Sequence, residues 1–122
     1  MPDNAYLQLL KKRRAEYKTY TPLFCPCLGE WITFNSNGFN HLRFHTDRKV
    51  RSLSEQIHKL NFLPHVRTAI KEAKMTEGYR KINGAEYWAL LMTIGKGNLK
   101  IRVIIRRIGK GKMCFWSVMR VK

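Results

Sequence analysis

Hydrophobic residues recur at helical spacing in the first part of the chain. Four segments show this pattern: residues 4–18, 38–46, 53–60 and 64–73. Ser52 and Glu55 form a capping box before the third segment, and Pro64 occupies the first turn of the fourth. Residues 21–29 hold two prolines and a glycine, which predicts a connector, and residues 30–34 predict a short strand.

After Gly78 the pattern becomes alternating and predicts four strands, at residues 79–82, 85–94, 99–108 and 112–121. Turn signals separate them at Asn83-Gly84, Lys96-Gly97 and Gly109-Lys110. Helices followed by consecutive strands favour an α+β fold, with N-terminal helices packed on one face of a four-stranded antiparallel β-meander. With 122 residues we expect one domain, made of a helical extension at 1–20 and a core at 21–122.

Two-residue turns set a register for the three long strands. The turn at Gly109-Lys110 predicts the pairs Ile105 with Cys114, Val103 with Trp116, Ile101 with Val118 and Arg102 with Ser117. The turn at Lys96-Gly97 predicts the pairs Met92 with Ile101, Leu90 with Val103, Trp88 with Ile105, Tyr87 with Arg106, Leu91 with Arg102 and Thr93 with Lys100. One sheet face then becomes an apolar wall for the helices to cover: Trp88, Leu90, Met92, Ile101, Val103, Ile105, Trp116 and Val118.

The opposite sheet face gathers cations, a phenol and a hydroxyl: Tyr87, Lys100, Arg102, Arg106 and Ser117. Such groups bind phosphate through charge-assisted hydrogen bonds. Alternatively, the arginines only keep a solvated face soluble. Leu91, Met113 and Phe115 would also be exposed there, and an exposed apolar patch favours ligand binding. We therefore expect Tyr87, Lys100 and Arg102 to bind substrate.

The charge of the chain is strongly positive. Twenty-four Lys and Arg against eight Asp and Glu give a net charge of +16, which indicates a polyanionic partner, either nucleic acid or an anionic membrane, unless it is only a solvated surface. No apolar run has the length of a membrane span, and the N-terminus lacks the pattern of a signal peptide. Three cysteines do not suggest a disulfide framework, so we expect a cytoplasmic protein without a membrane partner.

The stretch CPCLGEWITFNSNGFNHLRFH contains Cys25, Cys27, His41 and His45 in the order of a zinc finger. One residue separates the cysteines and thirteen separate Cys27 from His41, whereas zinc fingers leave roughly two to four and about twelve. Pro26 also removes an amide that a tight turn would use. The ligand types fit zinc but the spacing does not, so a zinc site through these four residues stays an alternative.

The two histidines also suggest acid–base chemistry, because residues at i and i+4 share a helix face. Cleavage of RNA without a metal requires one group to take the proton of the 2′-hydroxyl and another to protonate the leaving 5′-oxygen. Cations must also stabilise the charged phosphorane. His41 or His45, together with Arg102, Arg106 and Ser117, would supply these roles without a cofactor.

The segments CPC, GFNHLRFH, LNFLP, EYWALL, IRVIIRR and FWSVM, between residues 25 and 119, resemble the phage Barnase–EndoU–colicin–RelE-like (BECR) nucleases. GFNHL-x2-H and FWSVM are the specific parts of this resemblance. It implies helices on a four-stranded antiparallel sheet and metal-independent RNA cleavage that leaves a 2′,3′-cyclic phosphate. It implies His41 as general base or acid with His45 as its partner, Arg106 as a ligand of the scissile phosphate, and Ser117 as a group that positions this phosphate. An acidic antitoxin or immunity protein is an implied partner.

The leading hypothesis is therefore a small endoribonuclease, either a toxin or a phage-derived nuclease, that acts on RNA. The alternative is a non-catalytic nucleic-acid-binding domain, stabilised by zinc at Cys25, Cys27, His41 and His45. A membrane-surface protein that uses the helix at residues 4–18 is less favoured, because that helix has few large apolar residues.

Overall fold

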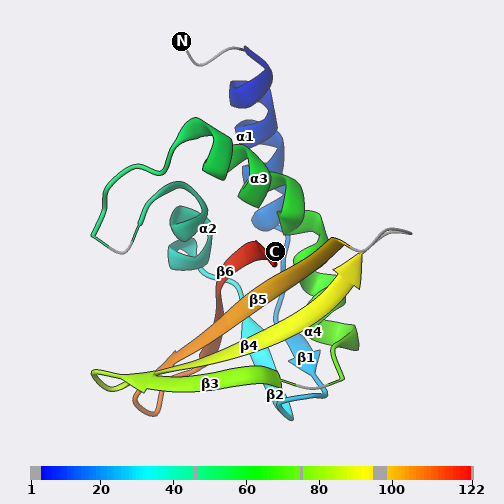
Figure 1. The fold of residues 1–122 in the computed structure, drawn as a ribbon, viewed down its shortest axis with the longest axis vertical. Coiled ribbons are helices and arrows are strands. Elements are labelled where there is room, and N and C mark those ends of the chain that lie inside the picture. The colour runs from blue at the N-terminus through cyan, green and yellow to red at the C-terminus, as the bar shows by residue number, and fades with distance from the viewer. Residues whose placement is uncertain (1–3, 46, 75, 95–98, 122) are drawn as a thin grey trace.

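Helices and strands are mostly separate along the chain, as the computed structural model shows (Figure 1). It describes residues 4–45, 47–74, 76–94 and 99–121. The elements are α1 (Asn4–Tyr17), β1 (Leu23–Cys25), β2 (Glu30–Thr33), α2 (Ser36–Arg43), α3 (Leu53–Phe62), the 3-10 turn η1 (Leu63–His65), α4 (Val66–Glu72), β3 (Thr76–Ile82), β4 (Ala85–Ile94), β5 (Leu99–Ile108) and β6 (Met113–Val121).

The strands form one six-stranded sheet in the order β1-β2-β6-β5-β4-β3. The α+β class is confirmed, but the prediction of a four-stranded antiparallel sheet is wrong. Two further strands, β1 and β2, extend it, and β2 runs parallel to β6. The prolines and glycine of residues 21–29 predict a connector, and the sequence does not reveal β1 because this strand has only three residues among them. Gly29 closes the turn to β2 with a φ of +67°, and its N–H donates to the Cys25 carbonyl.

Residues from all four helices and one sheet face share a single hydrophobic core. The sheet contributes fully buried residues from its three central strands: Leu90, Ile101, Val103, Ile105, Phe115 and Val118. Helix α1 contributes Tyr6, Leu10 and Tyr17. It lies beside α3 (Figure 1), and the Tyr6 hydroxyl donates to the Gln56 side chain of that helix. The N-terminal helix is therefore packed into the core of the protein.

The ends of several elements follow local sequence signals. The Ser52 side chain caps α3 by accepting from the Glu55 N–H at 3.2 Å, as the capping box predicts. Pro64 lies in the first turn of η1, which leads directly into α4. The predicted helix at residues 38–46 is displaced, because α2 starts at Ser36 and ends at Arg43.

The predicted register of β4 and β5 is confirmed. Leu90 pairs with Val103, Leu91 with Arg102 and Tyr87 with Arg106. The turn at Lys96-Gly97, on which this prediction rested, lies outside the described residues. Every pair predicted from that turn is nevertheless present between the two described strands.

The predicted register of β5 and β6 is wrong. The expected turn bond is present, from the Gly111 N–H to the Ile108 carbonyl at 2.9 Å. The observed pairs are nevertheless Arg106 with Cys114, Ile105 with Phe115, Ile104 with Ser117, Val103 with Val118, Arg102 with Met119 and Ile101 with Arg120. The pairing shifts between Ile104 and Ile105, which leaves Trp116 as the extra residue of a β-bulge.

This bulge redistributes the side chains of β6 between the two sheet faces. Phe115 and Val118 both enter the core, although regular alternation would separate them. Phe115 and Met113, expected on the open face, are buried, while Trp116, expected in the apolar wall, is outside the core. The bulge therefore sends an indole to the surface where the candidate site lies.

Candidate functional site

Helix α2 lies against β6, where it presents His41. The Asn35 side chain caps the helix by accepting from the Gly38 N–H at 3.2 Å. A Cβ atom at Gly38 would lie 2.5 Å from the Phe115 carbonyl oxygen. Only glycine permits so close an approach of helix to strand, and this approach brings His41 to the bulge of β6.

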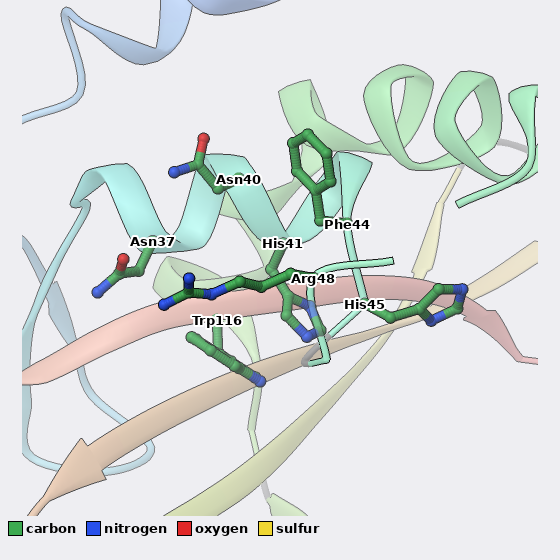
Figure 2. A pocket seen from close by; sticks show the side chains of 7 residues that line it. All are labelled: Asn37, Asn40, His41, Phe44, His45, Arg48 and Trp116. Atoms are coloured by element: carbon green, nitrogen blue, oxygen red, sulfur yellow. The ribbon is translucent and has the colours of Figure 1, made fainter. Parts of the chain in front are cut away.

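The His41 imidazole stacks on the Trp116 indole, with ring centroids 4.4 Å apart and planes inclined by 35°. Both rings line an open pocket of about 470 Å³ (Figure 2). The pocket is lined by Asn37, Asn40, His41, Phe44, His45, Arg48 and Trp116. His45 follows the end of α2, so the two histidines share the pocket without sharing a helix face as predicted.

Arg51 joins the two histidines. Its Nε donates to the His41 carbonyl at 2.9 Å, and its Nη2 lies 3.3 Å from His41 Nδ1. Its Nη1 lies 3.2 Å from His45 Nδ1 and donates at the same distance to Glu55. No sequence signal pointed to Arg51. The loop after α2 folds back, with the Arg51 N–H donating to the Arg43 carbonyl, and so returns this side chain to the histidines.

These contacts fix the protonation of the imidazoles. A guanidinium only donates, so each Nδ1 that it contacts must accept, and the proton of each neutral ring lies on Nε2. Burial, with a further contribution from the Arg51, Lys59, His45 and Arg106 charges, lowers the pKa of His41 to about 4. The free protein therefore holds His41 neutral near pH 7, with an N–H at Nε2.

Arg106 reaches Trp116 from β5. Its guanidinium carbon lies 4.1 Å from the centroid of Trp116 and 5.7 Å from that of Tyr87. Among the described residues, its Nε is buried without a hydrogen-bond acceptor. A second pocket of about 190 Å³ adjoins Arg106 and shares Asn37 and Trp116 with the histidine pocket. One continuous surface thus joins His41 to Arg106.

Ser117 does not lie on an open face as predicted. It is 2% exposed, because Lys59 of α3 covers it. The Lys59 ammonium donates to the Val118 carbonyl at 2.7 Å and lies 3.4 Å from Ser117 Oγ. Burial lowers the pKa of Lys59 to about 8. Lys59 therefore supplies a positive charge behind the pocket, and Ser117 is one of its buried partners.

The other predicted substrate-binding residues are divided along the sheet. Tyr87 lies beside Arg106, whereas Arg102 donates twice to Glu77, at 2.7 Å each. Four residues of strand place Arg102 roughly 13 Å from Arg106. Lys100 is exposed still farther along β5. Arg102 and Tyr87 do line a separate pocket of about 470 Å³, away from the histidines.

The alternative zinc site is not assembled in the structure. Cys25 is buried in β1 and Cys27 lies in the following turn, while His41 and His45 both face the positive charge of Arg51. The described residues contain no group of three or more His, Cys, Asp or Glu side chains able to hold a metal ion. The Arg51 guanidinium thus lies between the two imidazoles and occupies the place that a zinc ion bound to both Nδ1 atoms would take.

Within the ranges that the structure describes, no helix has the length and apolar character to span a membrane. Comparisons with family models, curated proteins and solved structures found no match. The geometry of the pocket and the charge of the chain are therefore the features that indicate a function.

Proposed function

We propose that this protein binds RNA at the surface joining His41, Trp116 and Arg106 and cleaves it without a metal ion. One observation carries the proposal: the imidazole of His41 and the guanidinium of Arg106 both contact Trp116, at the walls of two adjoining pockets. The indole holds these two polar groups near each other, and both offer hydrogen bonds to a phosphate. The net charge of +16 favours a polyanionic substrate.

Arg106 is suited to bind the scissile phosphate. Its buried Nε has no acceptor within the described part of the chain, and a buried donor without an acceptor is costly. A phosphate oxygen in the adjoining pocket would supply that acceptor. The flat guanidinium also contacts Trp116 and Tyr87, which restrict its orientation.

Cleavage proceeds by attack of the 2′-hydroxyl on phosphorus. The new bond closes a 2′,3′-cyclic phosphate, the bond from phosphorus to the 5′-oxygen breaks, one group takes the hydroxyl proton and another protonates the leaving oxygen. His41 and His45 are the candidates for these two roles. Arg106, Arg51 and the buried charge of Lys59 stabilise the negative charge that develops on the phosphorane.

Binding of the phosphate also changes the contacts of both histidines and the pKa of His41. In the free protein Arg51 occupies Nδ1 of both rings, so neither Nδ1 can accept a proton from substrate. A phosphate competes for this guanidinium, because charge-assisted bonds are stronger than bonds to neutral imidazole. Its negative charge also raises the pKa of His41 from the low value of the free protein. Substrate binding thus activates the acid–base pair.

A second function, a non-catalytic RNA-binding domain, is favoured by the same contacts of Arg51. If Arg51 stays on both Nδ1 atoms with RNA bound, each imidazole acts only as an Nε2–H donor to phosphate. Such a protein would bind RNA and leave it intact. The acidic inhibitor implied by the family resemblance remains a prediction for the nuclease alone.

The two functions are separated by incubating the purified chain with RNA in excess EDTA. We expect fragments with 2′,3′-cyclic phosphate ends from the wild type, and none from folded His41→Gln. His58→Gln is the matched control, because His58 is an exposed histidine of α3 that lines neither pocket. Binding without cleavage by the wild type would favour the second function. Cleavage that depends on added metal would overturn the proposal.

A further inference from the structure

The hairpin of β1 and β2 carries an exposed aromatic pair that the proposed chemistry does not use. Phe24 is 41% exposed and Trp31 is 61% exposed. Their ring centroids lie 5.6 Å apart with planes inclined by 67°. Cys25 and Ile32, the next residue of each strand, are fully buried, so the hairpin is anchored by one face and presents its aromatic face to solvent.

The strand pairing places these aromatics on the same sheet face as Arg106. Arg106 pairs with Cys114, and Cys114 pairs with Thr33. Trp31 precedes Thr33 by two residues and therefore points to the same face, and Phe24 pairs with Trp31. Two inter-strand steps of about 5 Å and two residues along the strand give a separation of roughly 12 Å between Arg106 and Trp31.

An exposed apolar side chain and a cation lie near the Arg106 pocket, on the way to the aromatic pair. Ile108 follows Arg106 by two residues on β5 and is 61% exposed. Ile108 and Lys112 line the pocket of Arg106. Lys112 directly precedes Met113, whose strand partner Ile32 adjoins Trp31. A chain leaving the Arg106 pocket would thus pass an exposed apolar side chain and a cation before it reaches the aromatic pair.

We propose that Phe24 and Trp31 form a stacking subsite for an unpaired base of single-stranded RNA, a few nucleotides from the phosphate held at Arg106. This subsite rests on the proposed function, because it extends the same substrate path. Aromatic rings bind unpaired bases with little sequence preference, and nearby cations hold the backbone. The charge of +16 and the position of the pair on the same sheet face as Arg106 favour RNA over an apolar protein segment as the occupant.

The test compares labelled, non-cleavable 2′-O-methyl RNA of about two nucleotides, too short to reach from Arg106 to Trp31, with RNA of about twelve nucleotides. Each is titrated against the full chain and followed by fluorescence anisotropy. Trp31→Ala should weaken binding of the longer RNA at least about fivefold and leave the shorter one unchanged. Trp31→Phe should restore most of the affinity. The salt dependence should stay that of the wild type, because the substitution removes no cation. Ile82→Ala, which removes an exposed apolar side chain on β3, is the control.

Equal weakening for both lengths, or none for the longer RNA, would overturn the subsite. If the wild type binds and cleaves RNA while Trp31→Ala binds the longer RNA normally, only the subsite fails. If the wild type binds neither RNA, the proposed function fails together with it. Circular dichroism of each variant establishes that the hairpin remains folded.

Discussion

Arg51 holds His41 at two atoms, donating to its carbonyl at 2.9 Å and lying 3.3 Å from its ring Nδ1. The first contact fixes the backbone at the end of α2, and the second fixes the proton of the ring on Nε2. A single side chain thus sets both the position and the protonation of the central imidazole. Arg51 also contacts His45 Nδ1, so it lies against both imidazoles of the pocket.

Replacing Arg51 should change the titration of His41. Burial is the main cause of its low pKa, and the charge of Arg51 is the largest electrostatic contribution. Arg51→Gln should therefore raise the pKa of His41 from about 4 toward, but not up to, its ordinary 6.5. Nitrogen-15 NMR measures both this pKa and the tautomer. Arg48→Gln, in the same pocket, is the control and should leave both nearly unchanged.

His41 should make stability depend on pH in the acidic range. Its pKa is lower in the folded state than in the unfolded chain, so the unfolded state binds more protons between pH 4 and 6.5. The free energy of unfolding should therefore fall as the pH falls through this window. Urea denaturation at several pH values measures it, with His41→Gln as the comparison. An equally steep fall in His41→Gln would assign the effect to other groups.

Arg106 should matter far more for cleavage than its neighbour in sequence. Arg106→Ala removes the donor that lacks an acceptor and should lower kcat/KM for RNA by about 100- to 1,000-fold. Arg107→Ala removes the same charge from the same strand and should change it less than about threefold, since Arg107 is paired with Glu86. Single-turnover kinetics compares the two variants, and similar losses in both would indicate a general charge effect.

Gly38 should be intolerant of even one methyl group. In Gly38→Ala the Cβ would clash with the backbone oxygen of Phe115, which cannot move without disturbing β6. We expect a loss of about 1–3 kcal/mol in the free energy of unfolding, measured with urea. Gly78→Ala is the matched control, because a Cβ there meets no atom within 4 Å. It should change stability by less than about 0.5 kcal/mol.

The sequence predicts those features of the fold that are determined by neighbouring residues. The turn signal at Lys96-Gly97 predicts the observed pairing of β4 and β5, and the capping box predicts the start of α3. It also brought His41, His45 and Arg106 forward as candidates, and all three lie at the adjoining pockets. The correct strand pairing and helix start share a cause, since each signal lies within one short motif.

The remaining errors concern relations between distant segments. The parallel pairing of β2 with β6 has no local signature, and a β-bulge does not change the hydrophobic pattern enough to be counted. Because the predicted register did not include the extra residue of the bulge, it assigned Phe115 and Trp116 to the wrong sheet faces. Arg51 was missed because its importance arises only when the loop after α2 returns it to the histidines.

The bulge at Trp116 means that this surface is encoded partly by the length of β6 and not only by its composition. Up to Phe115 the odd-numbered residues of β6 point to the core side of the sheet, whereas from Ser117 onward the even-numbered residues do, and Trp116 lies where this alternation changes. Substituting single side chains leaves that change in alternation intact. Deleting Trp116 alone would remove the bulge, while the other residues of β6 would keep their strand partners and their faces, so the length of the strand at this point determines whether the indole reaches the surface.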